Sequence, residues 1–286
     1  MQTTVGTRVQ DRGLRRARLR VRGERLIFRA IVLLCYLIIF APVLFVVLIS
    51  FFQSELVSFP PKGFSLRWYG NAWSHGDFLR ALITSLEVAV ASTVIGVCAG
   101  TLAAFGLRRS HIRFKGLFNT IFLGPLLLPG VVGGAAIYMG FFRVETAVDA
   151  DVTGTIWGLV AAHIMLTIPW SVRLVLASLA QFDPATEEAA ADLGASGWTI
   201  FRRITLPALR PGVVAACMFS FIASFENLEI SMFLVGPGRS TLPVAMLSYL
   251  EYRMDPTLAA VATAQIVLVG VLMLATDRYV SLSRVI

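Results

Sequence analysis

The side chains of this chain that could do chemistry lie inside its apolar segments. Three carboxylates (Glu87, Glu226 and Glu229) and one imidazole (His163) interrupt runs of otherwise apolar residues. An ionisable group in apolar surroundings is costly, so each of them needs a partner or a functional reason. Glu226 and Glu229 are three residues apart, which predicts that they share one face of a helix. They could line a path for a polar solute, or satisfy a broken helix, or pair with His163. For Glu87 a structural role is favoured.

The sequence contains no constellation for catalysis or for cofactor binding. His163 has no second His, Cys or acid at ligand spacing, which favours a packed helix histidine over a metal site. The nucleotide-binding pattern G-x-x-x-x-G-K-[ST] is absent, and no nucleophile is paired with a base. The chain is therefore not expected to be an enzyme or to hold a cofactor or a metal.

A polar, charged stretch at about 180–210 separates two long apolar runs and contains the text EAAADLGASGWTIFRRITLP. Asp183 and Pro184 predict a helix start, because the Asp side chain can cap free amides and Pro suits the first helical position. Gly194 is expected to end this helix in the left-handed conformation. Ser196 is predicted to cap a second helix, which the closing Leu-Pro would terminate. The stretch therefore predicts a helix–turn–helix bracket between two apolar helices.

The composition places these residues in a membrane protein. With 57% hydrophobic and 15% charged residues, and a mean hydropathy of +0.76, the chain is too apolar for a soluble domain. A spanning helix needs about twenty mostly apolar residues. The sequence then predicts an all-α fold with six spans, at about 26–52, 81–106, 116–142, 154–179, 211–235 and 257–281.

The basic residues predict how this membrane domain is oriented. An arginine-rich tail at 1–25 precedes the domain, which occupies 26–286, and further bases fall at 107–115, in the bracket and after the last span. Because Lys and Arg favour the cytoplasmic side, both termini and the bracket are predicted to be cytoplasmic. The net charge of +8 is thus explained by topology and by contact with lipid headgroups, and a nucleic-acid partner is not expected.

The spacing within the bracket is Glu-Ala-Ala, three residues, Gly, nine residues, Ile, one residue and Leu-Pro. It resembles the EAA loop of the permease subunits of binding-protein-dependent ABC importers. The resemblance covers about residues 80–275, because TSLEVAVASTVIGVCAGTLAAFGLRR and GPLLLPGVV are similar to the family's helices around its first inner loop. The specified positions are Glu188, Ala189, Ala190, Gly194, Ile204, Leu206 and Pro207.

The resemblance implies the fold of a type I importer permease in a bacterial inner membrane, with the bracket docked on the ATPase. It also implies the partners: two ATP-binding subunits, a second permease that is identical or distinct, and an extracytoplasmic substrate-binding protein. Closure of the ATPases would push on the bracket and switch the helices between inward-open and outward-open states. The alternative is an ion-coupled secondary transporter, which also has intramembrane acids but leaves the bracket pattern unexplained.

The text SFENLEISMFLVGPGRSTLPVAM is similar to the permeases of the spermidine/putrescine importer group. There the usual text has an Asp-Asp pair after Ser-Phe, whereas here the pair is Glu226-Asn227, with a second acid at Glu229. The resemblance implies a polyamine substrate, to whose ammonium groups Glu226, Glu229 and Glu87 would offer weak, successive sites. The departure from the usual text leaves the substrate open.

Overall fold

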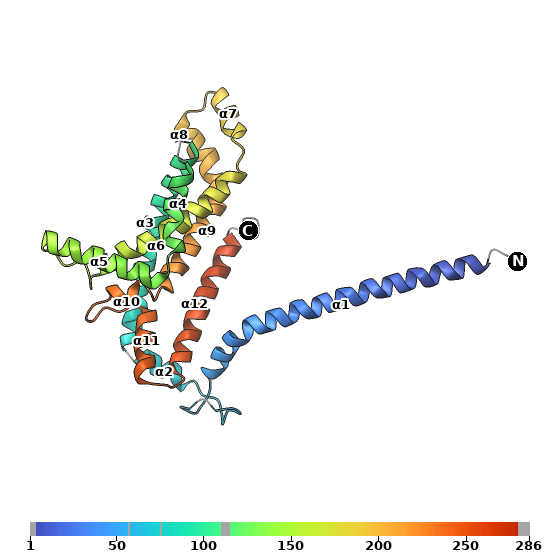
Figure 1. The fold of residues 1–286 in the computed structure, drawn as a ribbon, viewed down its shortest axis with the longest axis horizontal. Helices are drawn as coiled ribbons and strands as arrows, with labels where there is room; N and C mark the ends of the chain where they lie inside the picture. Colours follow the sequence, from blue (N-terminus) through green and yellow to red (C-terminus); the bar gives the residue numbers. More distant parts are fainter. Residues whose placement is uncertain (1–3, 57, 75, 110–114, 280–286) are drawn as a thin grey trace.

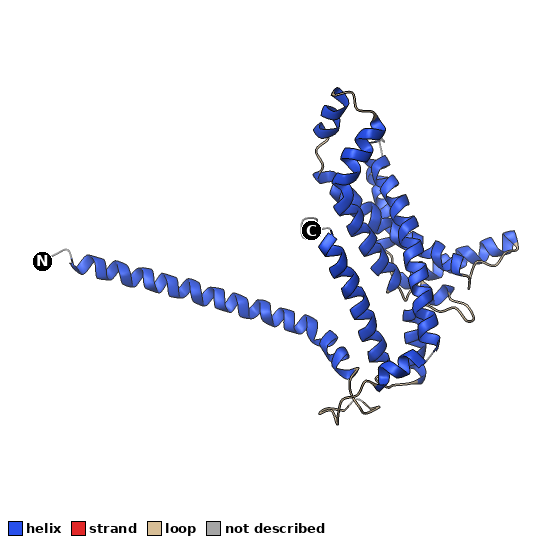
Figure 2. Cartoon of the chain, turned by 180° about the vertical axis from the view of Figure 1, so that it is seen from behind, coloured by secondary structure: helices blue, strands red, loops and turns tan. Residues whose placement is uncertain are grey.

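The computed structural model describes residues 4–56, 58–74, 76–109 and 115–279. These residues form helices and no strand (Figure 1, Figure 2). The first helices are α1 (Thr4–Ile49), α2 (Arg67–Ser74), α3 (Gly76–Arg109), α4 (Lys115–Leu127), α5 (Gly130–Val148) and α6 (Ile156–Gln181). The others are α7 (Ala185–Asp192), α8 (Gly197–Ile200), the π-helical turn η1 (Phe201–Thr205), α9 (Leu206–Phe225), α10 (Ser231–Leu234), α11 (Leu242–Tyr252) and α12 (Thr257–Tyr279).

Three long helices, α3, α6 and α9, pack against one another and form the core. Glycines allow this packing, because a side chain on Gly96 would collide with Thr167, and one on Gly100 would collide with Ser171. Small residues let helices approach closely where no hydrophobic effect drives them together, as in lipid. The core is therefore a tight three-helix unit with little freedom to deform.

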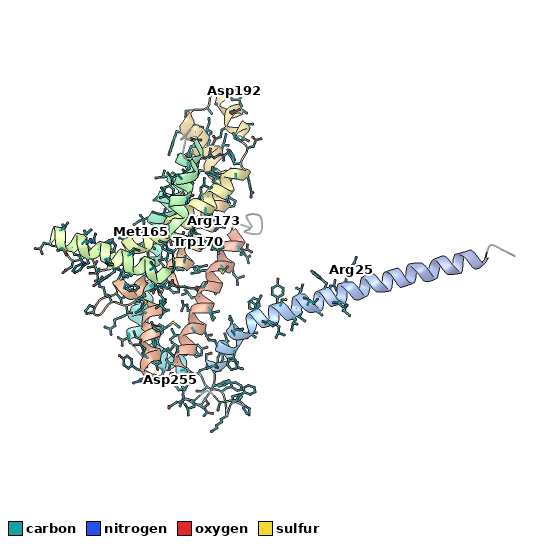
Figure 3. The ribbon with its side chains drawn as sticks, viewed as in Figure 1. Arg25, Met165, Trp170, Arg173, Asp192 and Asp255 are labelled. Atoms are coloured by element: carbon teal, nitrogen blue, oxygen red, sulfur yellow. The ribbon has the colours of Figure 1, made fainter. Side chains whose placement is uncertain are left out.

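The bundle has two distinct ends. The bracket, residues 183–207 with α7 and α8, forms one end, and α2 and α11 form the other, which we call the far end (Figure 1). Asp192 and Asp255 mark these opposite ends in Figure 3. Helix α1 extends away from the bundle and meets α12 only near its last turns. No residue of the most apolar stretch of α1 is buried in the single chain, although Val46, Val47 and Ile49 near its end are half-buried.

The structure confirms six helices that are long and apolar enough to cross a membrane, within the part of the chain that it describes. The predicted span 116–142 is wrong as a single helix, because α4 ends at Leu127 and α5 begins at Gly130. Pro129 lies between them; it has no N–H to donate and biases the residue before it away from helical geometry. Helix α5 leaves this break at a wide angle to α4 (Figure 1).

The predicted span 211–235 is also wrong in its bounds. One continuous helix runs from Gly197 to Phe225 through α8, η1 and α9, so Leu-Pro at 206–207 does not terminate the second bracket helix. The π-helical turn accommodates Pro207, because the Leu206 N–H reaches back to the carbonyl of Phe201. Beyond Phe225 the helix breaks, and the chain forms the short α10 and then α11, which lies between the predicted spans 211–235 and 257–281.

Candidate functional site

The first bracket helix, α7, has the start and the stop that its sequence predicts. The Asp183 carboxylate accepts a hydrogen bond of 3.0 Å from the Ala185 N–H. At the other end Gly194 has a φ of 84°, a value at which L side chains are strained. Its N–H donates to the Ala191 carbonyl (2.8 Å) and the next N–H donates to the Ala190 carbonyl (3.0 Å). This hydrogen-bond pair is a Schellman motif, which fixes the turn that follows α7.

The second bracket helix begins at the predicted cap. The Ser196 hydroxyl accepts a hydrogen bond of 3.3 Å from the Thr199 N–H. Because this helix continues into α9 without a break, a movement of the bracket is carried directly into the core. The second half of the bracket, from Gly197 on, is thus the end of a core helix.

The bracket presents an apolar and acidic surface at its tip. Of the seven residues of the EAA pattern, Ala190 and Ile204 are half-buried, and the other five are exposed, namely Glu188, Ala189, Gly194, Leu206 and Pro207. Two further apolar side chains stand out, since Leu193 is 89% exposed and Trp198 is 69% exposed. Apolar side chains gathered on an otherwise polar end of a molecule are typical of a surface that binds another protein.

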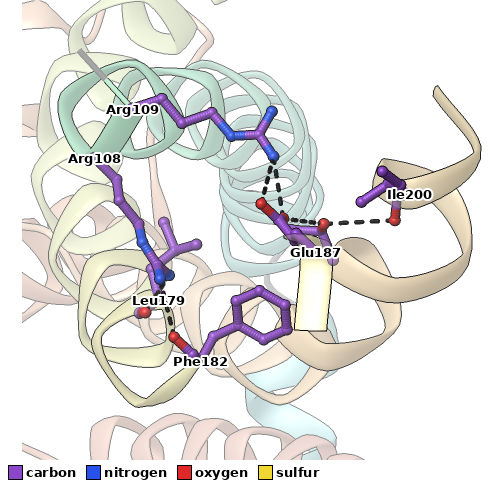
Figure 4. A network of polar contacts seen from close by, with 7 residues as sticks. Arg108, Arg109, Leu179, Phe182, Glu187 and Ile200 are labelled. Atoms are coloured by element: carbon purple, nitrogen blue, oxygen red, sulfur yellow. Dashed lines mark hydrogen bonds and ion pairs between the residues drawn. The ribbon is translucent and has the colours of Figure 1, made fainter. Parts of the chain in front are cut away.

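A cluster around Glu187 ties the bracket to the core (Figure 4). Arg109, at the end of α3, donates from Nη2 to both oxygens of Glu187 at 3.0 Å. The Thr205 hydroxyl, at the end of η1, also donates to Glu187. Beside it, Arg108 donates to the carbonyl of Phe182 at 2.9 Å and to that of Leu179, at the end of α6. Glu187 therefore joins α7, α3 and the helix that leads into α9.

Glu187 is not among the predicted site residues, because the EAA pattern begins at the next residue, Glu188. One signal could have found it: an acid in the first turn of a predicted helix, facing the bases that follow the second span. Of the two adjacent acids, the structure turns Glu187 towards the core, with 24% of its side chain exposed, and leaves Glu188 exposed.

A second site lies where α9 ends. Phe225 is the last helical residue, and residues 226–230 form a turn before α10. The Asn227 side-chain oxygen accepts a hydrogen bond of 2.9 Å from the Ile230 N–H, and the Ser231 hydroxyl donates to the Asn227 carbonyl at 2.7 Å. Glu226 and Glu229 thus do not share a helical face, and that prediction is wrong. Both lie on the turn, and both are exposed.

The break after α9 faces the break before α5. A Cβ on Gly130, the first residue of α5, would lie 2.7 Å from the carboxyl carbon of Glu229, and one on Gly134 would lie 2.7 Å from the Glu229 carbonyl. The carboxylate of Glu229 therefore lies directly against the start of α5. We call residues 128–130 and 226–230 together the junction.

The junction lies about halfway along the bundle. Ser224, next to it, shares a hydrogen bond of 3.0 Å with Ser92, which is near the middle of α3. A bundle with spans of this length has its middle in the hydrocarbon core of a bilayer. The two acids of the junction thus lie at a depth where unpaired charge is expensive.

His163 is packed in the core, as expected. Its ring bonds Ser224 through Nδ1 (2.7 Å) and Ser231 through Nε2 (3.2 Å). Neither Glu226 nor Glu229 forms a hydrogen bond or ion pair with it in the part of the chain that the structure describes. Among the same residues, no group of three His, Cys, Asp or Glu could hold a metal ion.

Glu87 lies apart from these groups on α3. It is exposed, and its neighbours on the same stripe, Ile83 and Val90, are exposed apolar side chains. Within the described part of the chain, Glu87 forms no hydrogen bond with Glu226 or Glu229. The structure therefore groups Glu226 and Glu229 at one junction and leaves Glu87 outside it.

The far end has a polar cleft of about 380 Å³ between the start of α3 and α11. Asp77 and Arg80 form an ion pair of 2.6 Å on its wall, and Tyr249 extends from the cleft to Asp255 with a hydrogen bond of 2.8 Å. Burial raises the pKa of Asp255, but hydrogen bonds from Thr257 and Tyr249 outweigh burial and hold it below its usual range. The far end therefore carries charged and polar side chains on its surface.

Comparison with known proteins decides the family. Residues 96–283, more than half of the chain, match the family described as "Binding-protein-dependent transport system inner membrane component". The chain belongs to this family. The match includes the bracket and the junction, so both sites lie in its shared part.

Three relatives are permeases. The "Putrescine transport system permease protein PotI" of Escherichia coli (strain K12) is 32% identical, over 84% of this chain and 86% of PotI. The "Spermidine/putrescine transport system permease protein PotC" of the same organism is 29% identical, over 85% of this chain and 89% of PotC. The "Putative 2-aminoethylphosphonate transport system permease protein PhnV" of Salmonella typhimurium (strain LT2) is 30% identical, over 84% and 87%.

Solved structures agree on the fold. A bacterial ABC transporter involved in the import of the acidic polysaccharide alginate matches with a TM-score of 0.69 at 16% identity, over 92% of this chain and 98% of that chain. The MetNI methionine ABC transporter matches with a TM-score of 0.56 at 18% identity, over 73% and 96%. Identities this low show the fold alone.

These findings establish the general function. The chain is an inner-membrane permease subunit of an ABC importer, homologous to polyamine permeases. The prediction from the EAA pattern is thereby confirmed, and the ion-coupled alternative is set aside. Importers of this fold act with other proteins, since one alginate transporter was solved in complex with a periplasmic protein.

Proposed function

We propose that this chain forms one half of the membrane pore of an importer for a small organic cation of the polyamine class. The observation that carries the proposal is the junction, where Glu226 and Glu229 are exposed at mid-depth of the bundle. The names of PotI and PotC support the same substrate class.

The environment of the two acids explains why a cation suits them. Exposed carboxylates at this depth are too costly to face lipid, so they face a partner or a water-filled path. The C-terminal end of α9 points at the same place and carries partial negative charge. Broken helices use such carbonyl ends to coordinate cations at mid-membrane. An ammonium group passing the junction would thus meet two carboxylates and a helix end in succession.

The relative PhnV makes 2-aminoethylphosphonate the competing substrate. That molecule carries an ammonium group and also a phosphonate, which needs a cationic partner. No Lys or Arg in the described part of the chain forms an ion pair with Glu226 or Glu229. The charge at the junction therefore favours a substrate with ammonium groups and no anion.

The coupling proposal assigns the bracket to the ATPase. Glu188, Ala189 and Gly194 form a low, exposed surface together with the half-buried Ala190. The exposed side chains of Leu193 and Trp198 flank this surface, and Ile204, Leu206 and Pro207 fix the start of α9 behind it. ATP hydrolysis then belongs to two separate subunits bound at this end. The bracket and both termini are cytoplasmic, and the binding protein delivers substrate at the cleft of the far end.

A second permease subunit, identical or distinct, completes the pore. Only 6% of the residues in the most apolar stretch of α5 are buried in the single chain, although α5 begins beside Glu229. A partner that covers α5 would place the junction at the interface between two permeases. That arrangement would surround the carboxylates with protein and water and keep them away from lipid.

The test measures uptake of labelled putrescine and spermidine by cells that depend on this chain. Glu226→Gln with Glu229→Gln should lower uptake at least tenfold, while the amount of assembled complex stays the same. Asp277→Asn, which neutralises an exposed acid near the end of α12, is the control and should transport normally. Unchanged uptake by the double variant would contradict the cation path. Competition by 2-aminoethylphosphonate but not by putrescine would contradict the substrate class.

A further inference from the structure

We propose that His163 is a positioning residue that holds the junction in shape and so sets the places of Glu226 and Glu229. This inference rests on the proposed function for its consequence in transport, but its geometry is independent of the substrate. His163 touches neither acid. It acts through the two serines that flank the turn between α9 and α10.

The ring spans the break in the helix. Nδ1 bonds Ser224, the last residue but one of α9, and Nε2 bonds Ser231, the first residue of α10. The two hydroxyls lie on either side of the turn at 226–230, so one rigid imidazole fixes the distance between its ends. Because the Ser231 hydroxyl donates its one hydrogen to the Asn227 carbonyl, it accepts a hydrogen bond from Nε2–H of the neutral ring. Nδ1 then carries no hydrogen and accepts from the Ser224 hydroxyl.

All three groups are out of contact with solvent. His163 is 1% exposed, Ser224 is 3% exposed and Ser231 is 0% exposed. Buried polar groups that lose their partner carry the full cost of desolvation, so the ring and the serines hold one another in place. The turn cannot widen or slide without leaving at least one of them unsatisfied.

We call His163 with its two partners, Ser224 and Ser231, the staple, and its hydrogen bonds continue into α3. The Ser224 hydroxyl forms a second hydrogen bond, with the Ser92 hydroxyl of α3. The Ser92 carbonyl in turn accepts a hydrogen bond of 3.0 Å from the Thr167 hydroxyl of α6. The staple is thus anchored to the two long helices that do not break. The turn itself contributes Asn227, whose side chain and carbonyl both bond to the start of α10.

Buried groups that do not face the substrate path, namely His163, Ser224 and Ser231, therefore fix the positions of both acids. Glu226 follows Ser224 by two residues, and Glu229 precedes Ser231 by two residues. With its base fixed, the turn presents the two carboxylates at a constant spacing. Without the staple, the turn has more conformations, and binding of a cation at both carboxylates loses its pre-organisation.

The chain offers a matched control for the test. Ser220 is one turn earlier on α9, is 0% exposed, and bonds Ser171 (3.1 Å) and the Thr167 carbonyl (3.2 Å). Like Ser231→Ala, Ser220→Ala removes one fully buried hydroxyl from the core, but Ser220 makes no contact with the turn at 226–230. Any general cost of losing a buried hydroxyl is common to both variants.

The first measurement is transport by the complete importer in proteoliposomes, with KM and kcat for putrescine. Ser231→Ala and His163→Ala should raise KM about tenfold at nearly unchanged kcat and unchanged complex assembly, and Ser220→Ala should leave KM unchanged. His163→Gln, which keeps a donor and an acceptor, should restore part of the affinity. Equal loss of assembly in Ser231→Ala and Ser220→Ala, or an unchanged KM in His163→Ala, would overturn the inference.

A second measurement separates this inference from the proposed function. Glu226→Cys, in a chain whose native cysteines are replaced, is labelled with a thiol reagent, with and without His163→Ala. A change of labelling rate of about fivefold or more supports the staple even if the glutamine variants of the acids transport normally. An unchanged rate would overturn it even if those variants fail.

Discussion

At the residue scale, two adjacent acids of the bracket, Glu187 and Glu188, have different surroundings. Glu187 is held by Arg109 and Thr205, whereas Glu188 is exposed at the tip. The sequence pattern could predict Glu188, because spacing alone carries it. It could not predict Glu187 or the staple of His163, because those contacts join residues that lie far apart in the chain.

Gly194 gives a test at this scale. Gly194→Ala places a side chain at a φ of 84°, which costs about 1–2 kcal/mol. The turn after α7 should shift, and association with the ATPase subunit should weaken about tenfold while the protein still inserts. Binding of the purified permease to the ATPase subunit measures this effect.

The control is Gly197→Ala. Gly197 also has open space around it, but it lacks a positive φ. This variant should bind the ATPase normally. Equal binding by both variants would show that the conformation of the turn has no part in docking.

At the element scale, hydropathy predicted how many helices cross the membrane but not where they break. Apolar composition continues through Leu128–Gly130, so no drop in hydropathy marks the break before α5. At the break after α9, Glu226, Asn227 and Glu229 do lower the hydropathy, but the apolar residues that follow them extended the predicted span to 235. Conversely, Leu-Pro at 206–207 looked like a stop signal, and the π-helical turn η1 carries the helix through it. Local signals misled here because neighbouring helices and a wider turn can satisfy the backbone groups that a proline frees.

The link between α3 and α7 gives a test of how movement is transmitted. Arg109→Glu or Glu187→Arg alone places like charges together at a distance that is now 3.0 Å, and the bracket should detach from α3. ATP hydrolysis should continue while transport per ATP falls several-fold. The double variant Arg109→Glu with Glu187→Arg should recover most of the loss.

The measurement is substrate transported per ATP hydrolysed by the reconstituted complex. Arg202→Glu, an exposed base on η1, serves as the control for a change of charge at this end. If the single charge reversals kept the normal ratio, the Glu187 cluster would have no part in coupling.

At the scale of the whole molecule, the described chain has a tight three-helix core, a different surface at each end, and the junction with its two carboxylates between these ends. The second half of the bracket is continuous with α9, and the junction lies where α9 ends. The far end contains the turn between α11 and α12. A push at the bracket therefore acts on the same helix whose other end carries Glu226. The order of these parts along one helix is the physical basis of the proposed coupling.

The central claim is that the bracket end binds the ATPase and the far end binds the substrate-binding protein. A photo-crosslinking residue at Ala189, on the bracket, or at Tyr252, which is 85% exposed on α11 at the far end, tests it directly in the membranes of growing cells. The account predicts that Ala189 crosslinks to the ATP-binding subunit and Tyr252 to the binding protein. Crosslinks from Ala189 to the binding protein, or none to the ATP-binding subunit, would contradict it.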